Sequence, residues 1–595
     1  MVKLMRRVLR INDMGRKIHV INKRSDELKV GVDIPSRADV LVSEILDSEL
    51  LGEGLIPTLQ NAHDMLLVEN PLTVPYKATT YGQLVECEFL RKLHELHGNE
   101  DRVLDNFHPV PPGLDSVLSI KQQQYPMHCD SLAEEIKLLT EPFKIFEFDF
   151  WKRPESHEET NLLIRATKGG TVHAVISWWV LQLDREGTIF YSTAPKWISH
   201  PTADADLGVP DGAQIDWCDH WKQCVWFVQE KGLSLSQEEE IHLHASHNET
   251  AISYNLTKQS SRKEIIKCRA PHVSNSLFLS PERIGIYGDP EWRLSLLSAA
   301  QKILQGKDSY SCVVADDSVF LTILIAKLSK VSQVISLFPG LQDGAKYLQA
   351  IADANDSLID RVKVVNKRSC LTMEDTQQRK VDLLIAEPYY YGNDGMLPWQ
   401  NLRFWKERTN LDSVLSNDVK IMPCKGILKA CAMSLPDLWK SRCCLDKVEG
   451  FDHSAVNSIL GASGEIPSPQ DSPFLPFFIW QCGRVEELSG RETVMEFEFT
   501  KPISLCRGQA KIELTKPGVC HGLVFWIEWV MDEEESIVIS TGPDKRYWKQ
   551  GVKLLATPKA IETNDATRGS KASCTIEASF DPSHGELTVH HIFAP

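Results

Sequence analysis

Apolar and polar residues along this chain follow two spacings, one typical of helices and one typical of strands. Met1–Asn12 has apolar side chains at helical spacing, which predicts a helix that ends before Gly15. Lys17–Asn22 and Val40–Val42 are short β-rich runs, and we expect two strands here, the second of them buried. A helix, a strand, a loop and another strand in this order indicate the closing part of a doubly wound α/β sheet.

The pattern changes after Pro75 to short runs rich in Val, Ile, Phe and Trp. Phe146–Phe150 and His173–Val180 are examples, and turn residues separate such runs. This alternation favours antiparallel β structure of barrel type. The polar passage Arg269–Asn275 reads as a linker.

From Ser280 the first pattern begins again. Pro281–Leu304 predicts a helix, Tyr310–Ala315 a strand and Val319–Leu328 a further helix. Sequence elements also recur at nearly constant distance, and these pairs are Ser25 and Ser369 in an Asn-Lys-Arg-Ser run, Glu44 and Glu387 after an apolar strand, Phe150 and Phe499, and Trp178 and Trp526. The chain is therefore predicted to be a tandem duplication of an α/β unit followed by a β unit.

We expect four domains from this repeat. They are the C-terminal part of a Rossmann-like domain at 1–75, an antiparallel β-barrel at 76–272, a second and degenerate Rossmann-like domain at 273–425, and a second barrel at 426–595. The fold class is thus α/β plus β, in tandem, with the first Rossmann-like copy truncated at its N-terminal side.

Composition narrows the class of protein. The 595 residues carry a formal charge of −16, which argues against nucleic acid as the main ligand and suits a basic protein partner. No apolar run approaches the ~20 residues of a membrane span, and charges interrupt the start of the chain where a signal peptide would be apolar. The 15 cysteines form no disulfide framework, which fits reduced thiols in cytoplasm or nucleus.

The loop that follows Val40–Val42 holds the strongest candidate chemistry. Glu44 and Glu53 lie nine positions apart, Asp47 lies between them, and Gly52 and Gly54 allow the loop to turn back. Two converging carboxylates suit a guanidinium, which is planar and always charged. An acidic loop after a strand is, on the other hand, often only solvated surface.

Ser43-Glu44 followed by Glu53 resembles the double-E loop of the protein arginine methyltransferases. Asp219-His220-Trp221 resembles their threonine-histidine-tryptophan loop, with Asp219 in the place of threonine. The duplication points to the tandem subtype of this family, and the resemblance extends over nearly the whole chain. It implies methyl transfer from S-adenosylmethionine to an arginine side chain of a protein.

The resemblance also assigns roles to single residues. It implies that Glu44 and Glu53 hold the guanidinium, that Asp47 narrows the pocket, and that His220 and Trp221 wall its far side. A lone histidine is otherwise more often structural. The end product is mono- or symmetric dimethylarginine, and both remain open.

The second copy departs from the pattern of the first. In the second copy Met396 occupies the position equivalent to Glu53, and Tyr547 occupies the position equivalent to His220. We therefore expect this copy to be a pseudo-enzyme. Its turn Val314–Phe320 has no glycine, and the next strand end, Ser336–Gly340, offers no acid for a ribose. This copy is not expected to bind the cofactor.

In the first copy the glycine-rich turn and the ribose acid are absent, and we interpret Met1 as an internal start. The resemblance implies that Ser25 and Asp26 lie near the adenine of bound S-adenosylmethionine. The alternative function is therefore a catalytically silent protein that binds arginine motifs as a scaffold. Arginine-rich proteins such as histones and RNA-binding proteins are the expected partners, and the second copy would replace a partner subunit, making a monomeric pseudo-dimer.

Two histidine or cysteine groups raise the question of metal. His242, His244 and His247 lie close together, but no cysteine or acid follows at ligand spacing, and we predict no metal there. Cys443, Cys444 and His453 lie where tandem relatives carry a zinc-binding knot, with Val448 at the position of an expected cysteine. That site stays open.

Overall fold

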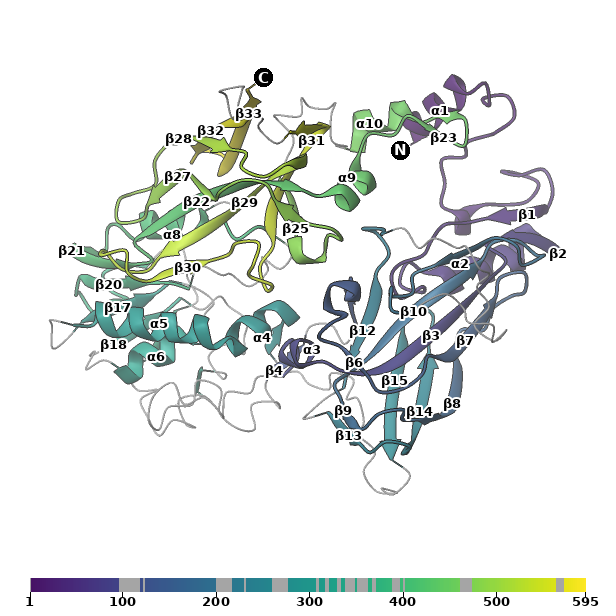
Figure 1. Cartoon of the computed structure of the whole chain (residues 1–595), viewed down its shortest axis with the longest axis horizontal. Coiled ribbons are helices and arrows are strands. Elements are labelled where there is room, and N and C mark those ends of the chain that lie inside the picture. Colours follow the sequence, from purple (N-terminus) through teal and green to yellow (C-terminus); the bar gives the residue numbers. More distant parts are fainter. Residues whose placement is uncertain are drawn as a thin grey trace. The chain divides into compact units, whose positions relative to one another are not determined.

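The structure of the chain is a computed structural model that divides into two compact units (Figure 1). Unit 1 comprises residues 1–95, 122–272 and 445–457, and unit 2 comprises residues 96–121, 273–444 and 458–595. The structure describes residues 2–95, 118–120, 124–198, 217–228, 232–258, 277–305, 310–315, 320–328, 333–337, 348–349, 362–365, 371–387, 396–399, 402–460, 474–562 and 572–594. The predicted linker Arg269–Asn275 lies outside these residues.

Unit 1 begins with the expected helix, α1 (Val2–Ile11), but not with the expected strand. Lys17–Asn22 is irregular, and the backbone N–H groups of Lys17 and Ile18 donate to Met14 O in a turn that follows α1. A strand needs a neighbour to pair with, and the described residues give this segment none. The predicted strand was therefore wrong.

The strand at Val40 is present as β1 (Ala38–Val42), which pairs in parallel with β2 (Leu67–Val74). The prediction that β1 is buried was wrong, because Val40 is 50% exposed and Val42 72% exposed. Within the described residues β1 has β2 as its one neighbour, so its two faces are not covered as the faces of a central strand are. Between β1 and β2 lie the acidic loop, α2 (Leu55–Asn61) and the π-helical turn η2 (Ala62–Leu66).

The rest of unit 1 is antiparallel, as the strand pattern predicts. A seven-stranded sheet has the order β5-β12-β10-β3-β6, with β11 on β10 and β7 on β3, and a three-stranded sheet has the order β15-β14-β8. One hydrophobic core joins the two sheets. The remaining elements of unit 1 are η1 (Ser25–Glu27), β3 (Lys77–Glu86), α3 (Glu88–Lys92), β5 (Gln124–Met127), η4 (Cys129–Leu132), β6 (Lys137–Leu138), β7 (Phe143–Asp149), β8 (Glu158–Arg165), β9 (Gly170–Val172), β10 (Ala174–Gln182), β11 (Phe190–Ser192), β12 (Gln223–Phe227), β13 (Leu233–Leu235), β14 (Glu240–His247), β15 (Ile252–Lys258), β23 (Lys447–Val448) and β24 (Phe451–Asp452).

Unit 2 contains a parallel sheet with the order β19-β18-β17-β20-β21, which is the order of one doubly wound, Rossmann-like sheet. Its helices α5 and α6 pack beside this sheet (Figure 1). The expected helix Pro281–Leu304 is two helices, α4 (Pro281–Gly288) and α5 (Pro290–Ile303), because Pro290 has no N–H to continue α4 and Asp289 caps α5 instead.

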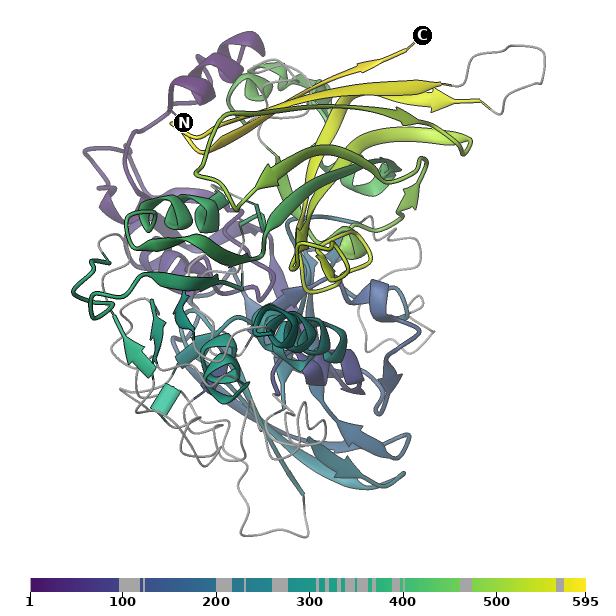
Figure 2. The same ribbon diagram turned by 90° about the vertical axis from the view of Figure 1, so that its left-hand side faces the viewer.

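A second seven-stranded antiparallel sheet follows in unit 2, with the order β25-β31-β29-β22-β26, β30 on β29 and β27 on β22. Its strands are among the green to yellow ones in Figure 2. This is the order of its counterpart in unit 1, strand for strand. The other elements of unit 2 are β4 (Leu118–Ile120), β16 (Leu277–Leu279), β17 (Ser311–Val314), α6 (Leu321–Leu328), β18 (Gln333–Ser336), β19 (Val362–Val364), β20 (Val381–Ile385), α8 (Arg403–Asn410), β21 (Leu415–Met422), β22 (Lys425–Ser434), α9 (Pro436–Arg442), β25 (Leu475–Phe477), η7 (Ile479–Gln481), β26 (Glu486–Glu487), β27 (Glu492–Glu498), β28 (Cys506–Glu513), β29 (Gly518–Val530), β30 (Val538–Ser540), β31 (Gln550–Ile561), β32 (Ser573–Asp581) and β33 (Glu586–Phe593), with α10 (Ser454–Leu460) at the boundary of the units.

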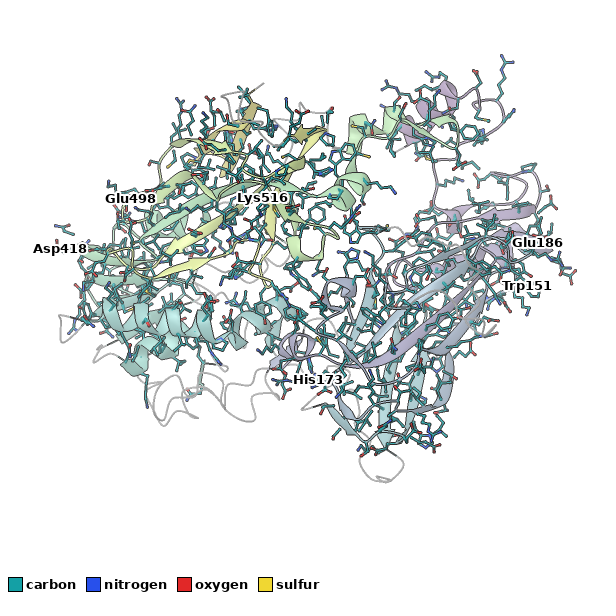
Figure 3. All side chains as sticks on the ribbon, viewed as in Figure 1. Trp151, His173, Glu186, Asp418, Glu498 and Lys516 are labelled. Atoms are coloured by element: carbon teal, nitrogen blue, oxygen red, sulfur yellow. The ribbon has the colours of Figure 1, made fainter. Side chains whose placement is uncertain are left out.

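Individual hydrogen bonds also recur between the two units. The buried ring of His173, labelled in Figure 3, accepts the N–H of Cys87 at 3.1 Å at the start of α3, and His521 accepts the N–H of Leu435 at 3.2 Å at the start of α9. Each pair of equivalent residues is separated by 348 positions. Among the described helices, none has the length and apolar character to cross a membrane.

Candidate active site

The acidic loop runs from the end of β1 to the start of α2. Ser43 N donates to Val74 O at 3.0 Å, which prolongs the β1–β2 pairing up to Glu44. Gly54 ends the loop with φ of +84°, a conformation that glycine adopts without steric cost, and it precedes the first residue of α2. The loop therefore has fixed ends on a strand and a helix.

Three leucines hold the loop on the barrel. Leu46, Leu50 and Leu51 are at most 2% exposed and belong to the same core as the strands of both antiparallel sheets. Leu50 has a φ of +86°, which is unfavourable for a side chain with a Cβ and is sustained here by complete burial. Burial of three leucines stabilises the loop by several kcal/mol, at about 1.5–3 kcal/mol each.

Asp47 fixes the curvature of the loop. Its Oδ1 accepts the N–H of Glu49 at 3.0 Å and the N–H of Gly52 at 3.1 Å. A Cβ on Gly52 would overlap the Asp47 carboxylate, so glycine is needed at this position. Asp47 was predicted to narrow a substrate pocket, and the structure places one of its oxygens within the loop itself.

Two tryptophans connect the loop to the barrel through their indole nitrogens. Trp221 Nε1 donates to Leu46 O at 2.8 Å, and Trp179 Nε1 donates to Asp47 O at 3.0 Å. The two rings meet edge to face, with centroids 5.3 Å apart. Trp179 is also part of the barrel core, and its contact with the loop could not be read from its sequence neighbours.

The Asp219-His220-Trp221 segment lies directly beside the acidic loop. Lys222 N donates to Ser48 Oγ at 3.0 Å, and Ser48 Oγ donates to His220 O at 3.5 Å. The His220 ring is exposed, with its centroid 5.7 Å from that of Trp221, while Asp219 is buried. The structure therefore brings together the two segments that the sequence marked 170 residues apart.

Glu44 and Glu53 lie near the two ends of the loop, and both are exposed. Neither side chain makes a hydrogen bond or an ion pair with any residue that the structure describes. A carboxylate that is buried or already paired within the protein could not bind an external ligand, whereas these two carboxylates are accessible to a cation from solution. Their convergence on one cation remains a prediction.

Glu49 is an acid of the same loop that the sequence did not single out. Its Oε1 accepts the N–H of Ile252 at 2.6 Å, from the first residue of β15. Burial raises the pKa of Glu49 from 4.5 to about 8, the hydrogen bond from Ile252 opposes this rise, and the nearby Asp47 adds to it. No signal in the sequence marks this burial, because Ile252 lies 203 residues away.

Glu49 makes the stability of the loop dependent on pH. The pKa of Glu49 is higher in the folded state than its ordinary value of 4.5, so the folded protein holds this proton more tightly than the unfolded chain does. The stabilisation that results is complete below about pH 4.5 and is lost as pH rises toward 8, by at most about 1.4 kcal/mol per pH unit. Glu49→Gln keeps an acceptor for Ile252 and removes the titration. We expect the melting temperature of Glu49→Gln to exceed that of the unchanged chain by more at pH 8.5 than at pH 5, with the exposed Glu69→Gln as control; a difference that does not vary with pH would contradict this.

The cofactor residues carried over from the family do not form a cradle. Ser25 and Asp26 are exposed in η1, and Asp26 receives two hydrogen bonds from Arg24, at 3.2 and 2.8 Å. These two residues do not form a glycine-rich turn, which would let a nucleotide approach the backbone closely. Ser25 and Asp26 by themselves thus do not enclose S-adenosylmethionine, and their place beside its adenine stays a prediction. In unit 2 the turn at 316–319 lies outside the described residues.

The histidines and cysteines that were considered as metal ligands make other contacts in the structure. His244 Nε2 lies 3.3 Å from Glu159, His247 is buried against the rings of Phe146 and Phe148, and His242 is exposed. Cys443 Sγ donates to Lys440 O at 3.3 Å, and His453 Nδ1 lies 2.9 Å from Phe451 O. Among the described residues no three His, Cys, Asp or Glu side chains are grouped as metal ligands.

Comparisons with known proteins assign the family. Residues 117–259 match the model described as the arginine methyltransferase oligomerization subdomain. Protein arginine N-methyltransferase 7 of Oryza sativa subsp. indica is 55% identical over 99% of this chain and 80% of its own length, and protein arginine N-methyltransferase 1.6 of Arabidopsis thaliana is 58% identical over the same shares. Protein arginine N-methyltransferase 7 of Xenopus laevis is 28% identical over 98% of the chain and 84% of its own length.

The similarity to these relatives covers nearly the whole chain. The plant relatives extend the similarity well beyond the barrel, through the acidic loop and through unit 2. The chain belongs to the protein arginine methyltransferase family, in the branch of protein arginine N-methyltransferase 7, a family of enzymes whose methyl donor is S-adenosylmethionine.

Proposed function

We propose that the chain is a protein-arginine N-methyltransferase that transfers a methyl group from S-adenosylmethionine to a guanidinium nitrogen of protein substrates, giving monomethylarginine and, as a second product class, symmetric dimethylarginine. The observation that carries this proposal is the pair Glu44 and Glu53, two exposed carboxylates without a partner among the described residues, on a loop fixed to the barrel. Family membership supplies the reaction class.

The residues of the loop have distinct parts in this function. Glu44 and Glu53 pair with the guanidinium, orient one nitrogen and concentrate electron density on it. His220 and Trp221 form the opposite wall, and Trp221 also holds the loop through Leu46. A narrow site between these groups favours release after one methyl group. S-adenosylmethionine would supply the methyl group, and Ser25 and Asp26 would lie beside its adenine.

We further propose that the chain is a tandem repeat in which the second copy replaces a partner subunit. The matching strand order of the two seven-stranded sheets supports this. Two parallel strand pairs also support the repeat. The register of β1–β2 shifts between Ala38 and Val40, and the register of β20–β21 shifts at the equivalent point, between Val381 and Leu383. Such irregularities are fixed features of a fold.

The substrates in this proposal are arginine-rich protein segments, such as those of histones and RNA-binding proteins. The formal charge of −16 attracts such segments and repels nucleic acid. The places of action are the cytoplasm and the nucleus, where thiols stay reduced. The cysteines among the described residues form no disulfide bond.

One observation favours the second candidate function, an arginine-binding scaffold without catalysis. Ser25 and Asp26 are exposed, and Asp26 is paired with Arg24. A protein that binds arginine through this loop without holding the cofactor would release arginine motifs unchanged.

Calorimetric titration of the 595-residue chain separates the two functions. Saturable heat with S-adenosylmethionine supports the enzyme. No heat with S-adenosylmethionine, together with saturable heat with an arginine-rich peptide, supports the scaffold. No heat with either ligand would overturn both. The same peptide with citrulline in place of arginine is the matched control, since it keeps the shape and loses the charge.

A further inference from the structure

Unit 2 contains a buried ionic cluster around Glu387, the residue that follows β20 as Glu44 follows β1. Glu387 is 2% exposed, whereas Glu44 is exposed. Its Oε1 lies 3.3 Å from Nη2 of Arg283, whose side chain is 4% exposed. Glu44 is thus exposed to solvent in the first copy, whereas its counterpart Glu387 pairs with a guanidinium of the same chain in the second copy.

Tyr287 completes the contacts of this guanidinium. Arg283 Nε and Nη2 donate to the Tyr287 hydroxyl at 3.0 and 2.6 Å, and that hydroxyl donates to Glu387 Oε2 at 3.3 Å. One planar fork therefore faces two acceptors, a carboxylate and a phenol oxygen. Two N–H groups of the fork thus converge on the phenol oxygen, while the carboxylate lies at ion-pair distance. A planar fork of this kind is available to arginine and not to lysine.

The helix that carries Arg283 is fitted closely to the second barrel. Arg283 and Tyr287 lie one turn apart on α4, which Ser280 caps by accepting the N–H of Arg283 at 3.3 Å. Gly285 lies between them, and a Cβ at this position would overlap the ring of Tyr547. Tyr547 stands where the first copy has His220. α4 thus lies against Tyr547, the counterpart of His220, and its residue Arg283 pairs with Glu387, the counterpart of Glu44.

Burial makes Arg283 and Glu387 mutually dependent. A buried charge is costly unless it has a partner, so removing one member of a buried ion pair strongly destabilises the fold. An ordinary structural ion pair would satisfy this rule as well. The position of Glu387 in the repeat and the guanidinium-specific contacts of Arg283 point to more than such a pair.

We propose that the second copy retains the guanidinium-binding site of the repeat and that Arg283 of the same chain occupies it in place of a substrate arginine. This inference rests on the proposed tandem repeat. It gives the chain one arginine site open to protein substrates, in unit 1, and one closed by an internal arginine, in unit 2. The ligand class of the second site is a monosubstituted guanidinium.

Chemical rescue tests this inference. Arg283→Ala removes the internal guanidinium and leaves Glu387 and Tyr287 in place. We expect the variant to melt at a lower temperature than the unchanged chain and millimolar ethylguanidinium to recover most of the loss, with little effect on the unchanged chain. Ethylammonium carries the charge without the fork, and we expect it to recover little.

The double variant Arg283→Ala/Glu387→Gln serves as the matched control. Recovery by ethylguanidinium in the single variant but not in the double variant supports the site. Equal recovery in both variants, equal recovery by ethylammonium, or no recovery overturns it. All of these readouts come from melting of the full chain without cofactor or peptide, so they are independent of whether unit 1 methylates arginine.

Arg283→Lys keeps the inference testable if Arg283→Ala does not accumulate as folded protein. A guanidinium-specific site predicts that the lysine variant is less stable than the unchanged chain by about tenfold or more in the folding equilibrium, as expected for the loss of a charged hydrogen bond. Equal stability of the two proteins would show that only positive charge matters and would overturn the inference.

Discussion

Glu53→Gln is expected to weaken binding of an arginine-containing peptide by about 10- to 100-fold, as is Glu44→Gln. Each carboxylate contributes a charge-assisted interaction with the guanidinium worth about 1.5–3 kcal/mol, and about 1.4 kcal/mol corresponds to a factor of ten. The amide keeps the size of the side chain but loses its charge. Calorimetric titration or fluorescence anisotropy with a labelled peptide measures the change.

Glu69→Gln is the control for this pair, because Glu69 is an exposed acid of β2 outside the loop. We expect its peptide affinity to be unchanged, and we expect a citrulline peptide to bind all four proteins equally weakly. An arginine peptide that binds Glu44→Gln and Glu53→Gln as tightly as the unchanged chain would remove the two acids from the site.

Gly52→Ala is expected to destabilise the acidic loop and to reduce arginine binding with it. The new Cβ would overlap the Asp47 carboxylate, which must then release the N–H groups of Glu49 and Gly52. Overpacking of this kind typically costs about 1–3 kcal/mol. Hydrogen exchange of the peptides that cover residues 44–56 reports the loss of protection, and the peptide titration reports the loss of function.

Gly15→Ala provides the matched control for the glycine substitution. No atom lies within 4 Å of a Cβ at Gly15, so the same chemical change has room there. We expect its hydrogen exchange and peptide affinity to match those of the unchanged chain. Protection of the loop that is as strong in Gly52→Ala as in Gly15→Ala would show that the Asp47 turn does not hold the loop.

Spacing along the sequence was sufficient for features that depend on local pattern. The helix at Val2–Ile11, the strand before Glu44 and the antiparallel strands around Phe146 and Trp178 are all present. Trp178 and Trp526, which recur along the sequence, lie in β10 and β29, and these strands have the same place in the order of their sheets.

Features that depend on distant neighbours could not be read from the sequence. The run Lys17–Asn22 has strand composition, but composition does not supply a neighbouring strand. Val42 is apolar and yet 72% exposed, because burial depends on what covers a strand. The raised pKa of Glu49 arises from its burial beside β15, and the role of Trp179 arises from the carbonyl of Asp47. The last two features are contacts across 203 and 132 residues.

The three buried leucines of the acidic loop have a consequence for the thermodynamics of recognition. Since Leu46, Leu50 and Leu51 are already immobilised in the core and two indoles already hold the backbone, the loop is preorganised before an arginine arrives. Little of the interaction energy is then spent on ordering the receptor. Affinity differences among peptides would accordingly reflect the conformational entropy that each peptide loses and the residues that flank its arginine, rather than rearrangement of the protein.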